Sequence, residues 1–173
     1  MSEEYTADGV KLSSRESGVA CAKCTGVLEI ASVEGFKIAA CRSCEGLLVE
    51  ARLLAKIIGL ARANYEGPEI APQPLDPSEL RMELQCVVCL NTMDTHPYCG
   101  PGSVVIDSCH HCGLIWLDRQ ELNRIVEAPG RRELLAADLM DFDRDNPTVG
   151  FSNMNPSVDQ TYVDDSLPWL FLY

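Results

Sequence analysis

The sequence lacks long apolar runs, an excess of basic residues and a high aromatic content. No apolar stretch approaches the roughly 18 residues of a membrane-spanning helix. The first residues, MSEEYTADGVKLSS, show no apolar segment behind a basic one, so we expect no secretory signal, no membrane contact and a cytoplasmic location. There are 14 Lys and Arg against 26 Asp and Glu, and the resulting net charge of −12 disfavours a general grip on phosphate backbones.

Cysteine is what the sequence has in abundance, since nine are present and eight fall into C-x2-C pairs. Two residues between cysteines let a tight turn aim both sulfurs at one point, and two such turns complete a tetrahedron around a metal ion. The spacing between the pairs is typical of four-cysteine zinc sites. The sequence therefore predicts two closed, structural Zn²⁺ sites, the first formed by Cys21, Cys24, Cys41 and Cys44, the second by Cys86, Cys89, Cys109 and Cys112.

Three other uses of the cysteines compete with zinc. Eight cysteines form an even set for disulfides, but no secretory signal supports an oxidising compartment. A redox C-x2-C motif requires a strand-then-helix setting and does not repeat four times. Iron in a rubredoxin-like site is the main competing metal, less favoured than zinc.

The two cysteine clusters align as copies of one unit. Leu48 matches Trp116, and Glu50 matches Asp118. In each copy we expect a β-hairpin followed by a helix. The hairpin strands are expected over 27–30 and 36–39 in the first copy, and over 92–94 and 104–107 in the second. The first helix is expected over 50–64, and the second begins at a D-x-x-E capping pattern that starts at Asp118 and ends at Glu121.

The expected fold class is small α+β, with two tandem four-cysteine zinc ribbons, each a short antiparallel β-hairpin followed by an α-helix. Whether the ribbons pack on each other stays open. The expected segments are a flexible N-terminus (1–18), the first ribbon and helix (19–65), a Pro-rich linker (66–79), the second ribbon and helix (80–128), a further helix (129–142) and a flexible acidic-aromatic tail (143–173).

The second copy carries Val104-Val105-Ile106-Asp107 before its last cysteine pair, then Trp116-Leu117-Asp118 and Glu121-Leu122. With these residues in register, it resembles the transcription factor IIB-type zinc-ribbon family of bacterial zinc-finger proteins. Leu114 stands where the family often has a second glycine. The first copy is a weaker match that keeps Gly46 at this place but has Leu48-Val49-Glu50 for W-L-D. The resemblance implies a zinc-bound ribbon fold and little about activity.

Several other residues have a functional and a structural interpretation. Cys99, with His96 nearby, is interpreted as a loop thiol and a loop imidazole, with an auxiliary metal contact or a reactive thiol as the alternative. His110 and His111 are interpreted as exposed turn residues. Trp116 is interpreted as a packing residue rather than a partner-binding one.

The C-terminal residues are acidic and end in five large apolar side chains. They either dock back on the protein or bind a partner, because such a stretch is unfavourable in water. The possible partner-binding residues are Trp169, Leu170, Phe171, Leu172 and Tyr173.

The leading functional hypothesis is a non-enzymatic, zinc-binding adaptor with a protein partner, because no catalytic constellation is readable. The first alternative is a transcription-linked regulator that contacts RNA polymerase or nucleic acid through the ribbons, although the acidity disfavours direct nucleic-acid binding. The second alternative is a redox or metal-handling protein. The sequence leaves the oligomeric state open.

Overall fold

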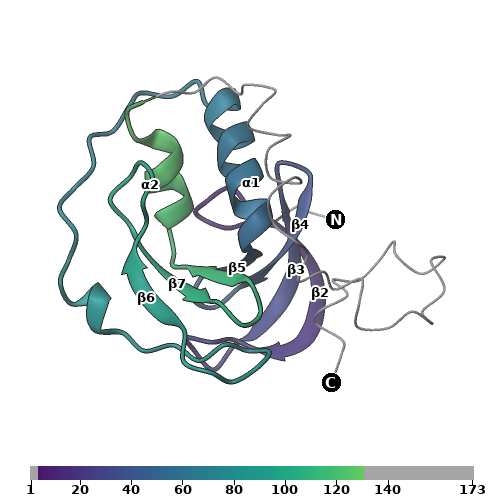
Figure 1. Cartoon of the computed structure of the whole chain (residues 1–173). Helices are drawn as coiled ribbons and strands as arrows, with labels where there is room; N and C mark the ends of the chain where they lie inside the picture. Colours follow the sequence, from purple (N-terminus) through teal and green to yellow (C-terminus); the bar gives the residue numbers. More distant parts are fainter. Residues whose placement is uncertain (1–3, 131–173) are drawn as a thin grey trace.

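The computed structural model describes residues 4–130, which form one eight-stranded antiparallel sheet and two α-helices (Figure 1). The strand order is β1-β2-β3-β4-β5-β8-β7-β6. The elements are β1 (Glu4–Tyr5), β2 (Lys11–Ala20), β3 (Val27–Val33), β4 (Phe36–Cys41), β5 (Leu47–Glu50), α1 (Ala51–Asn64), the 3₁₀ turn η1 (Glu79–Arg81), β6 (Asp94–Pro97), β7 (Val105–Cys109), β8 (Leu114–Leu117) and α2 (Glu121–Glu127).

The repeat in the sequence is a repeat in the structure. The first ribbon contains β3, β4 and β5 and leads into α1, and the second contains β6, β7 and β8 and leads into α2. The sequence predicts two strands in each copy, with the apolar residues after the last cysteine pair leading into a helix. The structure instead places a third strand there, because these short apolar runs are buried on both faces of the sheet.

The third strands join the two ribbons, since β5 pairs with β8 antiparallel. Leu48 lies opposite Trp116, its own counterpart in the repeat, and the flanking pairs are Leu47 with Leu117 and Val49 with Ile115. A pseudo-two-fold axis therefore passes between Leu48 and Trp116. The packing of the ribbons, which the sequence left open, is a continuous sheet.

The two faces of this sheet have different coverings. Figure 1 shows α1 and α2 side by side over one face, where they pack on Leu47, Val49 and Leu117. The other face carries a second buried cluster, which we call the cysteine face. Its buried members are Cys21, Leu28, Ala39, Cys41, Leu48, Leu84, Cys86, Met93, Cys109, Leu114 and Trp116, with the other four paired cysteines packed against them.

Side chains of unequal size complement each other across the pseudo-two-fold axis. Trp116 is completely buried, and a Cβ on Gly46 would lie 2.8 Å from Cε2 of its indole ring and closer still to Cζ2. The counterpart of Gly46 in the repeat is Leu114, and the register places it diagonal to Leu48, the smaller counterpart of Trp116. The first ribbon thus needs glycine where the second needs a large side chain.

The N-terminal segment is part of the fold, so the expectation of a flexible segment over 1–18 is wrong for residues 4–18. Val10 and Leu12 are buried in the helix-side core, which fixes β2 against β3. The Asp8 carboxylate accepts hydrogen bonds from the backbone N–H groups of Gln120 (2.7 Å) and Asn123 (3.0 Å). Asp8 therefore caps the N-terminus of α2 from a distance of more than a hundred residues.

The D-x-x-E pattern at the start of α2 forms only one half of the expected capping box. The Glu121 carboxylate accepts the backbone N–H of Asp118 at 2.7 Å, as one half of a capping box does. The Asp118 carboxylate does not cap the helix, because it accepts the indole N–H of Trp116 instead.

The strand expected over 92–94 is displaced in the structure. β6 spans Asp94–Pro97, so His96 and Pro97 belong to a strand rather than to the following loop. Proline is tolerated there because β6 is an edge strand. The expected helix over 129–142 and the tail over 143–173 lie outside the described residues, apart from 129 and 130. Neither helix in the described range has the length and hydropathy of a membrane span.

Filling the space at Gly46 is predicted to separate the ribbons. Gly46→Ala should lower the free energy of unfolding by roughly 1–3 kcal/mol, because the indole of Trp116 has nowhere to move in the buried cluster. Thermal and denaturant unfolding measure this. A Gly46→Ala/Trp116→Leu double variant should lose less than the sum of the single variants, and strictly additive losses would contradict the proposed contact.

Candidate metal centres

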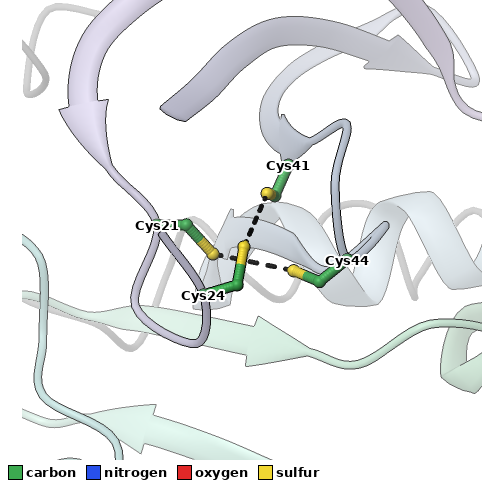
Figure 2. Close-up of side chains that lie close together, drawn as sticks. All are labelled: Cys21, Cys24, Cys41 and Cys44. Carbon is green, nitrogen blue, oxygen red and sulfur yellow. Dashed lines mark hydrogen bonds between the residues drawn. The ribbon is translucent and has the colours of Figure 1, made fainter. Parts of the chain in front are cut away.

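Two turns form the first cysteine cluster, one between β2 and β3 and one between β4 and β5 (Figure 2). Cys21 follows β2 and Cys24 lies in the turn before β3, whereas Cys41 ends β4 and Cys44 lies in the turn before β5. Sγ of Cys21 lies 3.6 Å from Sγ of Cys44, and Sγ of Cys24 lies 3.5 Å from Sγ of Cys41. All four sulfurs lie within 4.8 Å of one another.

The second cluster has the same arrangement in the second ribbon. Its members are Cys86 and Cys89 from the turn before β6, Cys109 at the end of β7 and Cys112 in the turn before β8. Sγ of Cys89 lies 3.5 Å from Sγ of Cys109, and the four sulfurs again lie within 4.8 Å. The structure therefore brings together all eight predicted ligands, in the predicted two sets.

The turns that carry the cysteines share a backbone conformation. The residue after the second cysteine is left-handed in three of the four turns, at Glu45, Leu90 and Gly113, with φ values of 57°, 60° and 64°. Each of these residues donates its N–H to the carbonyl of the first cysteine in its turn. This geometry closes the turn and directs both sulfurs to the same side.

Backbone N–H groups also point at the sulfurs. Cys21 Sγ accepts the N–H of Lys23 and Cys24 Sγ accepts that of Gly26, both at 3.3 Å, and Cys109 Sγ accepts that of Cys112 at 3.4 Å. Such donors stabilise a thiolate more than a thiol. The turns are thus built for sulfur atoms that carry charge.

The sulfur positions fit a tetrahedral zinc ion. Four sulfurs at the usual Zn–S distance of about 2.3 Å lie about 3.8 Å apart, close to the separations found in both clusters. All nine cysteines lie in the described residues and all are free, so the disulfide interpretation is wrong for this structure. Four thiolates complete the coordination of Zn²⁺ and leave no position for a substrate or water.

Burial sets the protonation of the metal-free clusters. It raises the pKa of the Cys21 and Cys86 thiols to about 11, and it raises the pKa of Cys44 and Cys112 as well. The pKa of Cys24 is lowered instead, chiefly by the Gly26 N–H. The four thiols with a raised pKa therefore hold protons at neutral pH until a metal ion displaces them.

The remaining sequence candidates lie outside both clusters. Cys99 is an exposed thiol, and His96 shares a hydrogen bond of 2.9 Å between Nε2 and Ser108 Oγ. His110 pairs with Asp94 on the surface. Within residues 4–130, no histidine belongs to a group of metal-ligand geometry. Trp116 is wholly buried, which confirms its interpretation as a packing residue.

A comparison with protein families gives a match to the second ribbon. The model of the transcription factor zinc-finger family, the TFIIB-type zinc ribbon, matches residues 85–128, which hold the second cysteine cluster, β6 to β8 and α2. Neither curated proteins nor solved structures gave a significant match. Residues 85–128 therefore match a zinc ribbon in sequence and have its four-cysteine geometry, whereas the first ribbon shows the geometry alone. Together these findings support two Zn²⁺ sites.

Some residues that position the sites gave no signal in the sequence. Lys23 and Glu45 lie in the cysteine turns of the first ribbon and pair with Asp118 and Arg119 of the second. These partners are more than 70 residues away along the chain. No local sequence pattern predicts such a pair, and only the β5–β8 register brings the two residues together.

Removing one ligand of the second cluster is predicted to release its metal. The purified protein should contain two zinc ions per chain and lack the visible absorption of iron thiolates. Cys112→Ser should lose the second zinc and unfold the second ribbon, because structural zinc contributes roughly 10–16 kcal/mol in comparable domains. Metal analysis, far-UV circular dichroism and thermal melts measure this. Cys99→Ser is the matched control, and a Cys112→Ser variant that melts like it would contradict the assignment.

Zinc affinity is predicted to rise with pH. Zinc binding releases the protons that the metal-free thiols hold. For each proton released, the zinc affinity falls about tenfold when the pH falls by one unit. Competition with a chelator between about pH 6 and pH 8, corrected for protonation of the chelator, should show a slope steeper than one proton. An affinity independent of pH would show that thiols are not the ligands.

Proposed function

We propose that this chain is a non-enzymatic protein-interaction adaptor whose two zinc ions are structural. The observation that carries this proposal is the closed chemistry of the two clusters. Every ligand position of a tetrahedral zinc ion is filled by a cysteine of the same ribbon. Both sets of sulfurs lie in or against the buried cysteine face.

An exposed segment between the ribbons supplies a surface for a partner. We call residues 66–83 the linker strap. It contains Ile70, Leu80 and Met82, which are three of the six large apolar side chains exposed in the described residues. It also contains five acidic side chains and one basic one. An exposed surface of this composition suits a partner that is both apolar and basic.

A hollow beneath the linker strap adds to this surface. It has a volume of about 380 Å³ and lies between the strap and α2, where Asp76, Glu79 and Glu127 line it together with Arg124. Oε2 of Glu79 is buried and accepts no hydrogen bond within the described structure. A lysine or arginine side chain of a partner would satisfy this oxygen.

Charge favours the adaptor over direct nucleic-acid binding. A four-thiolate zinc site carries net negative charge, so loading both sites makes an acidic chain more acidic. A transcription-linked regulator is the second candidate, favoured by the family match at 85–128. In that case the acidic surface would face a basic patch of RNA polymerase. Redox chemistry is disfavoured by zinc, which has no redox function.

Surface substitutions in the full chain test the adaptor. Ile70→Asn and Leu80→Asn should each reduce recovery of bound proteins severalfold in affinity capture, because they remove apolar contact area without touching the core. Leu90→Asn is the matched control, since Leu90 is exposed, is not part of the strap and has the left-handed backbone that asparagine tolerates. Unchanged recovery in both strap variants would contradict a strap interface.

The predicted tail site and the alternative function have separate tests. Trp169→Ala with Phe171→Ala examines the tail residues, which lie outside the described range. A DNA-binding titration across salt concentrations examines the regulator hypothesis. Direct binding would give an affinity that falls steeply with salt, whereas the adaptor predicts no binding even at low ionic strength.

A further inference from the structure

Besides the β5–β8 pairing, several contacts between the ribbons are made by the turns that hold the metal ligands. Lys23, between Cys21 and Cys24, forms an ion pair with Asp118 of the second ribbon. Glu45, next to Cys44, forms an ion pair with Arg119 at 3.1 Å between Oε2 and Nε. Both turns of the first site thus hold one short segment of the second ribbon, residues 116–119.

Packing reinforces this grip. Gly46, two residues after Cys44, lies directly against the indole of Trp116. The indole N–H donates to Oδ1 of Asp118 at 2.9 Å, so the residue that pairs with Lys23 also fixes the orientation of Trp116. Trp116 belongs to the same buried cluster as ligands of both sites.

The second site is held by the first ribbon in return. Gly113, next to Cys112, accepts the N–H of Ala51 at 2.9 Å. Ala51 is the first residue of α1, and its neighbour Glu50 lies opposite Leu114. The turn before β8 is therefore attached to the start of the helix that follows β5.

These contacts link the free energies of the two sites. A ribbon of this size has little core of its own and depends on its metal to stay folded. Without zinc in the first site, its two turns no longer hold residues 116–119, and β8 loses the order of its neighbour β5. The second ribbon then pays a larger cost to form its own site. Thermodynamic linkage makes the effect reciprocal.

We propose that the two four-cysteine sites fill and empty as a coupled pair, because zinc in one ribbon raises the zinc affinity of the other through residues 116–119. The chain then has two populated metal states, fully loaded and metal-free. Loss of zinc occurs over a narrower range of free zinc concentration than it would for two independent ribbons on a linker.

Native mass spectrometry of the full chain during a zinc titration tests this proposal. Two independent sites, whatever their affinities, place at least about half of the molecules in the one-zinc state when half of the sites are filled. The coupled pair predicts a one-zinc fraction clearly below that value. A fraction of one half or more would overturn the proposal.

A pair of matched variants locates the coupling. Asp118→Asn removes the ion pair with Lys23 between the ribbons and keeps an oxygen for the Trp116 indole. Asp94→Asn alters the 3.1 Å contact between Oδ2 of Asp94 and Nε2 of His110, a residue that also lies in a cysteine turn but stays within the second ribbon. Asp118→Asn should raise the one-zinc fraction towards one half, and Asp94→Asn should leave it at the wild-type value.

The same comparison shows whether Asp118 is a coupling residue or only a stabilising one. Total zinc at saturation should remain two per chain in both variants, so a merely structural defect would appear there first. Equal one-zinc fractions in the two variants would overturn the part assigned to the Lys23–Asp118 ion pair.

Discussion

The pairing of β5 with β8 is the interaction on which the rest of this structure depends. Four residues from each ribbon meet there in antiparallel register and turn two small units into one sheet. The helices that follow these strands are thereby brought together on one face, and the eight ligand cysteines are brought to the other. A zinc ribbon alone would expose this strand edge, and sheet edges invite pairing with whatever is near. In this chain, each ribbon satisfies the edge of the other.

Zinc and the apolar core stabilise different parts of the fold. Zinc holds the cysteine turns, three of which contain a left-handed residue. The apolar residues of the third strands hold the ribbons to each other. Trp116 connects the two effects because it is packed among the ligands and against the opposite ribbon. The linker strap keeps its own contacts with the fold, among them the hydrogen bond that the Ile70 N–H donates to the Glu127 carbonyl and the one that the Met82 carbonyl accepts from Thr95. It leaves the side chains of Ile70, Leu80 and Met82 exposed.

The sequence predicted the parts of the fold that depend on short-range spacing. Cysteine spacing gave both ligand sets, and the helix expected over 50–64 is α1, which spans Ala51–Asn64. The sequence does not reveal the third strands, because a short apolar run directly ahead of a helix looks like the start of that helix. Only pairing with a distant strand makes these residues β. The order of the N-terminal segment likewise depends on distant residues, since the hydrogen-bond partners of Asp8 are the backbone N–H groups of Gln120 and Asn123. Gly46 was noticed as a family feature, but its physical reason lies in Trp116 of the other ribbon.

Proton NMR of the zinc-loaded protein tests the junction of the ribbons most directly. Because the N–H of Ala51 donates to Gly113, the alternation of an antiparallel ladder makes Leu48 and Trp116 a non-hydrogen-bonded pair, in which the two Hα atoms approach closely. We predict a strong nuclear Overhauser effect between Hα of Leu48 and Hα of Trp116, and another between Hα of Glu50 and Hα of Leu114. Clear cross-strand effects within each ribbon, without either of these two, would show separate ribbons and contradict the account.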